Sequence, residues 1–259
     1  IQGFFVSFFE INIVELPGTF VGLLNYKRAF TDDQFYQALL HNVYFWLVGL
    51  AINFWPPILL AFLINEVRKY RTFMRMIYFI PAVAPIITIT VLWKFIWQPD
   101  YGFANYLLGI VNLEPQMWLN DPKLAYWCMY FPGLLVAGGM NMLIYLAAIQ
   151  EIPQEHYEAS LIEGAGFIHR IRYITLPQMM PIIKIMFILD LITRFNEVNT
   201  PLVMTGGGPI GATETLILYA YKSAVNSQDY SYAITLANIV FVIIFVITAL
   251  KMRLNSNKG

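Results

Sequence analysis

Long apolar blocks separated by short polar stretches dominate the chain. The blocks lie at about 41–64, 74–97, 124–149, 182–203 and 232–251. Each contains the roughly 20 residues that a helix needs to cross about 30 Å of hydrocarbon. The pattern therefore predicts an all-α, polytopic membrane protein with five complete transmembrane helices.

Two further features refine this prediction. The apolar start, IQGFFVSFF, is interpreted as the tail of a truncated first membrane helix rather than as a signal peptide. Prolines inside three of the blocks predict kinks, which packed neighbouring helices or a lined cavity can tolerate. These prolines are Pro56, Pro57, Pro81, Pro85 and Pro132.

Composition supports a membrane protein and argues against other classes. Hydrophobic residues make up 58% of the 259 residues and charged residues 12%, about half of the share that is usual in soluble domains. The formal net charge is zero, so nothing indicates nucleic-acid binding. Cys128, the single cysteine, lies in an apolar block and is expected to serve packing. His41, His156 and His169 have no metal-ligand spacing, so we expect neither a metal site nor catalytic residues.

Basic residues in the polar stretches predict the orientation, because short cytoplasmic loops carry an excess of lysine and arginine. Three basic groups, within 68–75, 170–184 and 251–258, fall on the same side of a five-helix zigzag. The opposite stretches, which include residues about 10–38, are richer in acidic residues. We therefore expect the stretch around residue 170 and the C-terminus in the cytoplasm, and residues 10–38 outside.

A compact polar stretch, from Glu158 to Pro177, interrupts the apolar pattern. Pro153 suits the first position of a helix, which Gly164 and Gly166 are expected to break. Apolar residues at helical spacing then predict a second short helix that ends at Pro177. For an arbitrary membrane protein, such a stretch is most simply a solvated cytoplasmic loop.

The residues of this stretch closely resemble the cytoplasmic coupling loop of permease subunits of binding-protein-dependent ABC importers. The family pattern is Glu-Ala-small, three residues, Gly, nine residues, Ile-x-Leu-Pro. It is met at Glu158, Ala159, Ser160, Gly164, Ile174, Leu176 and Pro177. Ser160 and Glu163 stand where the family usually has alanine and aspartate.

Other segments extend the resemblance to the sugar-importer branch of the family. LVMTGGGPIGATETL (202–216) resembles its Thr-x-Gly-Gly-Pro segment, and the short tail after Lys251 resembles the maltose-type "F" permease. A phosphate-binding loop is the alternative for TGGGP, but the segment lacks the Gly-Lys-Ser/Thr ending and is interpreted as a turn.

The resemblance implies a single transmembrane permease domain over residues 1–259, with a coupling loop at about 151–180. It implies a transport subunit rather than an enzyme, in the cell membrane of a prokaryote and in contact with lipid, that translocates a sugar or sugar derivative. The expected partners are a second homologous permease, a cytoplasmic ATPase dimer and an extracytoplasmic solute-binding protein. ATP and Mg²⁺ would be bound by the ATPase, with no cofactor in this chain.

Charged residues in the fourth apolar block are unfavourable in lipid by about 2.5–3.5 kcal/mol each, so they need a protein or water-filled surrounding. Asp190, Arg194 and Glu197 are spaced four and three residues apart and are predicted to line one helical face. The resemblance places substrate-lining residues at this offset from the Thr-x-Gly-Gly-Pro segment, and Asn141 and Met140 are expected to face the same cavity.

Charge at these positions favours an acidic or otherwise substituted saccharide, with Arg194 as the partner of its anion. The alternative is a permanent Asp190–Arg194 ion pair with no substrate contact.

Two other function classes stay open from the residues. A membrane-embedded transferase would need clustered acid, base or metal groups, which the sequence does not show. A non-transporting membrane adaptor would need only the polar stretch, to dock a cytoplasmic partner.

Overall fold

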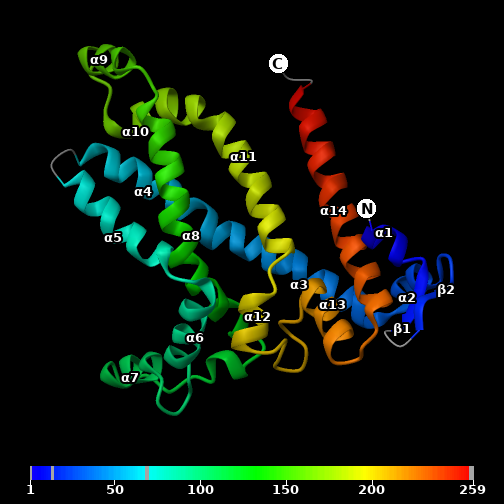
Figure 1. Cartoon of the computed structure of the whole chain (residues 1–259). Helices are drawn as coiled ribbons and strands as arrows, with labels where there is room; N and C mark the ends of the chain where they lie inside the picture. Colours follow the sequence, from blue (N-terminus) through cyan, green and yellow to red (C-terminus); the bar gives the residue numbers. More distant parts are fainter. Residues whose placement is uncertain (1, 13–14, 68–69, 257–259) are drawn as a thin grey trace. The chain divides into compact units, whose positions relative to one another are not determined.

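Helices form most of the computed structural model, which describes residues 2–12, 15–67 and 70–256 (Figure 1). The predicted cytoplasmic residues Arg68, Lys69 and Lys258 lie outside these ranges. The α-helices are α1 (Gln2–Val6), α2 (Leu24–Thr31), α3 (Asp33–Gly49), α4 (Trp55–Glu66), α5 (Arg71–Val83), α6 (Ile86–Ile96), α7 (Phe103–Ile110), α8 (Ala125–Gln150), α9 (Gln154–Ile162), α10 (Phe167–Arg170), α11 (Leu176–Phe195), α12 (Asn199–Met204), α13 (Leu216–Val225) and α14 (Tyr230–Ser256). The other elements are the π-helical turns η1 (Leu50–Phe54) and η3 (Ile171–Thr175), the 3₁₀ turn η2 (Trp118–Asn120), and the strands β1 (Phe9–Asn12) and β2 (Glu15–Phe20).

The five predicted membrane helices correspond to five apolar segments of the structure. Within the described residues, three helical segments are long and apolar enough to cross a membrane: Asp33–Glu66, Phe167–Met204 and Tyr230–Lys251. The second is interrupted between α11 and α12. Two bent helix pairs, α5 with α6 and the two halves of α8, pass the same test together. The predicted all-α membrane architecture is confirmed, and these segments give up to five spans if each bent pair crosses as one.

The second predicted span, 74–97, is not one continuous helix. Its two parts, α5 and α6, meet at 91°. Ala84 lies between them with φ −71° and ψ 142°, because the ring of Pro85 disfavours the helical conformation in the residue before it. The predicted kink is therefore a sharp turn, and the prediction of a single helix here was wrong.

Two compact units make up the chain. The first comprises Ile1–Leu47, Lys94–Cys128 and Leu191–Gly259, and the second comprises Val48–Trp93 and Met129–Asp190. Each unit has its own cluster of buried apolar side chains.

The core of the first unit is formed by side chains of α3, α13, α14 and the end of α11. Asn42, which is 1% exposed, lies among them and joins two helix ends. Its Oδ1 accepts a hydrogen bond from the N–H of Leu216 (2.6 Å), and its Nδ2 donates to the carbonyl of Phe195 (3.4 Å). Helix ends leave such backbone groups without partners, so Asn42 stabilises both the end of α11 and the start of α13.

The core of the second unit is formed by side chains of α4, α8 and α11, with Met142 and Tyr145 almost fully buried. In this unit α8 approaches the backbone of α5 closely at Gly139. A Cβ at this position would lie 2.0 Å from the carbonyl oxygen of Tyr78. Small residues allow such close helix packing in membranes.

A small antiparallel hairpin accompanies the helices near the start of the chain. β1 and β2 pair Phe9 with Phe20 and Glu10 with Thr19. Gly18, with φ 85°, has no room for a Cβ beside the carbonyl of Glu10. The apolar start of the chain is therefore helical only over α1 and becomes a strand at Phe9.

Candidate functional site

The predicted coupling loop forms a helix, a tight turn and a second helix. α9 begins directly after Pro153 and ends in a turn where Gly164 has φ 77°, a left-handed conformation that favours glycine. The N–H of Ala165 donates to the carbonyl of Ser160 (2.9 Å), and the N–H of Gly164 donates to that of Leu161 (3.0 Å). These two bonds define a Schellman motif. The predicted helix break at Gly164 is confirmed.

The seven residues of the family pattern divide into exposed and inward-facing positions. The exposed ones are Glu158, Ala159, Gly164 and Pro177. Ile174 and Leu176 are half-buried and pack against the core of the second unit. Ser160 is 8% exposed, and its hydroxyl donates to the carbonyl of Tyr157 (2.7 Å). Ser160, Ile174 and Leu176 therefore hold the loop in place.

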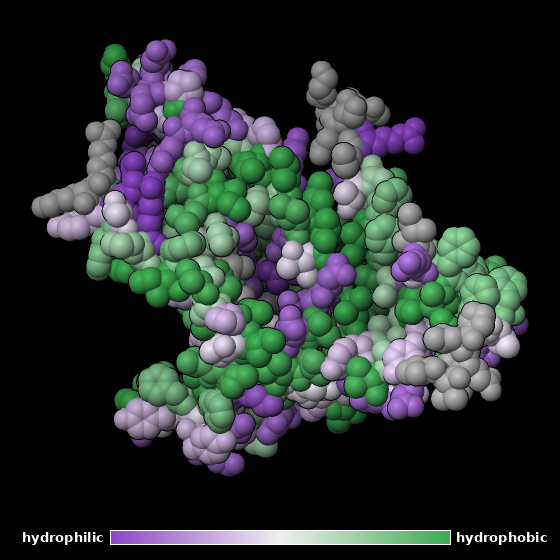
Figure 2. Space-filling view, viewed as in Figure 1, coloured by the Kyte–Doolittle hydropathy of each residue, from purple (hydrophilic) through white to green (hydrophobic). Residues whose placement is uncertain are grey.

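Three apolar side chains near the turn are more than half exposed, which the sequence did not predict. Leu161 is 57% exposed, Ile162 89% and Ile168 77%. Figure 2 shows that hydrophilic residues predominate over α9 and α10, whereas hydrophobic residues cover the helices below. Large apolar side chains that face solvent in polar surroundings indicate a contact surface for another protein. The sequence signal for two of them was the Leu161–Ile162 pair, which precedes Glu163 and Gly164.

The second helix of the loop does not end at Pro177. α10, η3 and α11 form one continuous helix that runs through this proline. A proline inside an α-helix removes a hydrogen bond and clashes with the carbonyl four residues back. The wider π-helical turn immediately before Pro177 relieves this conflict, so the predicted helix end was wrong. The loop is thus continuous with the helix that carries Asp190 and Arg194.

Two contacts within the second unit connect the coupling loop to neighbouring elements. The hydroxyls of Tyr157 on α9 and Thr175 on η3 lie 2.9 Å apart. Arg170 Nη2 lies 3.3 Å from Glu66 Oε2, which joins α10 to the end of α4. Both contacts border a pocket of about 480 Å³ that is lined by residues of α4, α5, α8, α9 and α10, including Arg71, Gln154 and Glu158.

Asp190 and Arg194 lie one turn apart on α11, and both are half-buried. Glu197 is not on the same helical face, because α11 ends at Phe195. Its Oε1 accepts a hydrogen bond from the N–H of Thr200 (2.9 Å) at the start of α12. The prediction that all three charges line one face was wrong for Glu197, whose carboxylate satisfies a helix-end donor instead.

The remaining predicted pathway residues lie next to each other on α8. Met140 is 48% exposed and Asn141 is half-buried. A shared cavity for these residues and Arg194 stays a prediction.

Lys94, a further charge in an apolar block, donates to the carbonyl of Val203 (2.8 Å) on α12. The lysine thus ties α6 to α12.

A sequence profile of the family described as "binding-protein-dependent transport system inner membrane component" matches residues 39–257. The chain belongs to this family. The matched segment contains the predicted coupling loop, four of the apolar segments and most of the fifth, Asp33–Glu66. The permease is therefore a multi-pass inner membrane component.

Curated relatives of the permease include named transport subunits. The trehalose/maltose transport system permease protein MalF of Thermococcus litoralis is 33% identical, over 90% of this chain and 79% of the relative. The sulfoquinovosyl glycerol transport system permease protein SmoG of Agrobacterium fabrum is 30% identical, over 98% of this chain and 83% of the relative.

A solved structure supports the fold. A bacterial ABC transporter involved in the import of the acidic polysaccharide alginate contains a chain that matches with a TM-score of 0.84 and 22% identity. The match covers 97% of this chain and 88% of the other. The permease therefore has the ABC importer permease fold.

A charged cluster joins α2, α13 and α14 in the first unit of the permease. Arg28 Nη1 lies 2.5 Å from Asp229 Oδ2, and its guanidinium lies 4.0 Å from the ring centre of Tyr232. Asp32 Oδ2 accepts hydrogen bonds from the hydroxyls of Tyr219 and Tyr232, both at 2.6 Å. In the described part of the chain, no group of His, Cys, Asp and Glu side chains could hold a metal ion.

The pKa values of this cluster follow from its contacts. Burial alone would raise the pKa of Asp32, but the hydrogen bonds from the two tyrosines and from backbone N–H groups outweigh it and hold that pKa below the usual value. Burial, together with the bond to Asp32, raises the pKa of Tyr219 to about 12. The cluster therefore keeps Asp32 ionised and Tyr219 protonated at neutral pH.

Proposed function

We propose that this permease translocates a sugar or sugar derivative as one subunit of an ATP-driven importer. One observation carries the proposal. The family match over residues 39–257 includes a turn that presents Leu161, Ile162 and Ile168 to solvent. Such side chains are suited to burial in a cleft of a partner protein.

The proposed partner at this turn is a cytoplasmic ATPase dimer, which would also bind ATP and Mg²⁺. Closure of that dimer would displace α9, and the Tyr157–Thr175 contact would pass the displacement to η3. Because η3 continues into α11, the movement would reach the segment that carries Asp190 and Arg194. A second homologous permease would complete the pathway, and an extracytoplasmic binding protein would deliver the substrate.

A saccharide is the substrate class that the relatives favour. One relative is named for trehalose and maltose and another for sulfoquinovosyl glycerol. Arg194, half-buried on α11, offers a planar guanidinium that suits a carboxylate or sulfonate. We therefore include acidic saccharides among the expected substrates, with Asp190, Asn141 and Met140 as further pathway residues.

Reconstitution tests this function. The permease, co-expressed with a second permease of the family and an importer ATPase from the same organism, should co-purify with both. In proteoliposomes the complex should hydrolyse ATP faster when loaded binding protein is added, and should accumulate the saccharide. A complex that binds a cytoplasmic protein but neither hydrolyses ATP nor moves saccharide would instead identify a membrane adaptor.

The proposed orientation places the coupling loop and the C-terminus in the cytoplasm. His169 and Asp33 are both exposed, so cysteines at these positions should be reactive from one side only. With the buried Cys128 replaced by alanine, an impermeant thiol reagent added to intact cells should label Asp33→Cys and leave His169→Cys unlabelled. Labelling of His169→Cys before the cells are permeabilised would reverse the orientation.

A further inference from the structure

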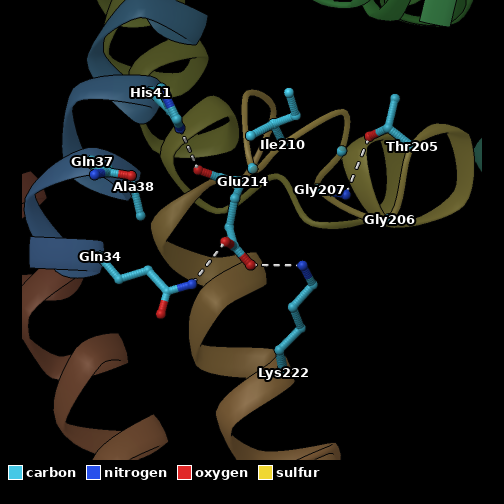
Figure 3. A pocket seen from close by; sticks show the side chains of 12 residues that line it. Gln34, Gln37, Ala38, His41, Thr205, Gly206, Gly207, Ile210, Glu214 and Lys222 are labelled. Carbon is cyan, nitrogen blue, oxygen red and sulfur yellow. Dashed lines mark hydrogen bonds and ion pairs between the residues drawn. The ribbon is translucent and has the colours of Figure 1, made fainter. Parts of the chain in front are cut away.

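A polar pocket in the first unit belongs neither to the coupling loop nor to the charged residues of α11. Figure 3 shows it between α3, the loop from Thr205 to Glu214, and α13. Its volume is about 470 Å³, within the range of about 300–1,000 Å³ that is usual for small-molecule sites. The side chains that supply its polar groups are Gln34, Gln37, His41, Glu214 and Lys222.

The loop that walls this pocket has a fixed conformation. Thr205 Oγ1 and Thr213 Oγ1 lie 2.6 Å apart, and Thr213, which is 0% exposed, also donates to the carbonyl of Gly208 (2.6 Å). Gly206 and Gly207 have φ 61° and 88°. This left-handed conformation favours glycine, and a Cβ on Gly207 would lie 2.7 Å from Lys222 Nζ and displace the lysine side chain. The wall is therefore built before any ligand arrives.

The charges in the pocket balance each other. Glu214 is 7% exposed, and its Oε1 lies 2.7 Å from Lys222 Nζ. Its Oε2 accepts a weaker hydrogen bond from Gln34 Nε2 (3.4 Å). The ion pair leaves the pocket without net charge, so a free anion or cation gains little electrostatic binding energy there. An ammonium has three N–H donors, so Lys222 can still donate to a ligand.

The remaining groups are neutral donors and acceptors. His41 Nδ1 lies 3.2 Å from the carbonyl oxygen of Glu214. A carbonyl only accepts, so Nδ1 donates in this contact, and in a neutral imidazole Nε2 is then an acceptor. Gln37 lies one turn before His41 on α3, and its exposed amide supplies both a donor and an acceptor. Such a mixture matches hydroxyl groups, which donate and accept.

We propose that this pocket is an outer subsite that holds one ring of the incoming saccharide through its hydroxyl groups. The proposal rests on the proposed function and places this pocket on the extracytoplasmic side. Because the pocket forms hydrogen bonds with hydroxyl groups and has no net charge, it binds neutral and acidic saccharides alike. Ile210, which is 98% exposed, stands at the rim of the pocket (Figure 3).

Protection of a rim cysteine tests the subsite. The variant Ile210→Cys, in a Cys128→Ala background, is assembled with its partner subunits in nanodiscs without binding protein. Its labelling rate with a small thiol reagent is then measured with and without millimolar maltotriose or trigalacturonate. Both saccharides should slow the labelling. Gln37→Ala should weaken this protection about fivefold, the order of one neutral hydrogen bond.

Controls separate this proposal from the proposed function. Gln98→Ala, in the same unit but outside the pocket, should leave the protection unchanged. A cysteine at Tyr101, which is 69% exposed, should label at the same rate with and without saccharide. Lack of protection by both saccharides overturns the subsite, whether or not the complex transports. Protection that persists in a complex without transport overturns the proposed function and keeps the subsite.

Discussion

Replacing Gly164 with valine is expected to abolish ATP-driven transport while the subunit still inserts and folds. Gly164 has φ 77°, and a left-handed conformation is unfavourable by about 1–2 kcal/mol for ordinary residues and more for β-branched ones. No atom lies within 4 Å of a Cβ built at this position, so the β-carbon of a larger residue fits there without a clash. The strain therefore falls on the turn that presents Leu161 and Ile162. Uptake by proteoliposomes, and stimulation of the ATPase by loaded binding protein, measure the loss.

Gly166 provides a matched control two residues away. It has φ −70°, a conformation open to any residue, and a Cβ there also meets no atom within 4 Å. Gly166→Val should therefore transport close to normally, and Gly164→Asn should be intermediate because asparagine tolerates the left-handed region. If Gly164→Val transports as well as Gly166→Val, the turn does not couple ATP hydrolysis to transport.

The turn at Gly164 could be predicted because its cause is local. A glycine after a helical segment is a direct signal for a residue in the left-handed conformation at the C-terminal end of the helix. The Schellman bonds involve only residues 160–165. Pro177 misled the prediction for a different reason. A proline normally ends or kinks a helix, and no sequence pattern predicts the π-helical turn that allows this helix to continue.

Hydropathy located the membrane segments but not their directions. It measures length and apolarity, so it found 74–97 as one block and could not see the 91° turn at Ala84. Pro85 was visible, but whether a proline bends a helix slightly or breaks it depends on its packing. Glu197 shows the same limit, because spacing alone could not reveal that α11 ends at Phe195.

The pocket beside Glu214 could not be predicted because it depends on contacts between distant segments. Gln34 and His41 on α3 meet Glu214 only in the folded unit, across more than 170 positions of sequence. The resemblance drew attention to the glycines and the proline of the Thr205–Pro209 segment. It gave no reason to connect them with α3.

Replacing Arg194 with glutamine is expected to lower the transport of an acidic saccharide about 10- to 100-fold. A hydrogen bond to a charged partner contributes about 1.5–3 kcal/mol, and a bidentate guanidinium adds fixed geometry. Loaded binding protein should still stimulate the ATPase, because the coupling turn is unchanged. Uptake of trigalacturonate and of maltotriose is measured with the same proteoliposomes. This separates loss of anion binding from a general loss of transport, because uptake of the neutral saccharide should fall less. Arg194→Lys keeps the charge without the planar fork and should be intermediate.

The competing explanation is a permanent ion pair between Asp190 and Arg194, one turn apart on α11. It makes a different prediction, because removing one partner of such a pair leaves an uncompensated charge in the membrane. Under that explanation Arg194→Gln would fail to assemble, and adding Asp190→Asn would restore both assembly and transport. Under the substrate-binding explanation Arg194→Gln assembles normally, and the double variant stays as poor with trigalacturonate as the single one. Gel filtration of the complex, measured beside uptake, decides between them.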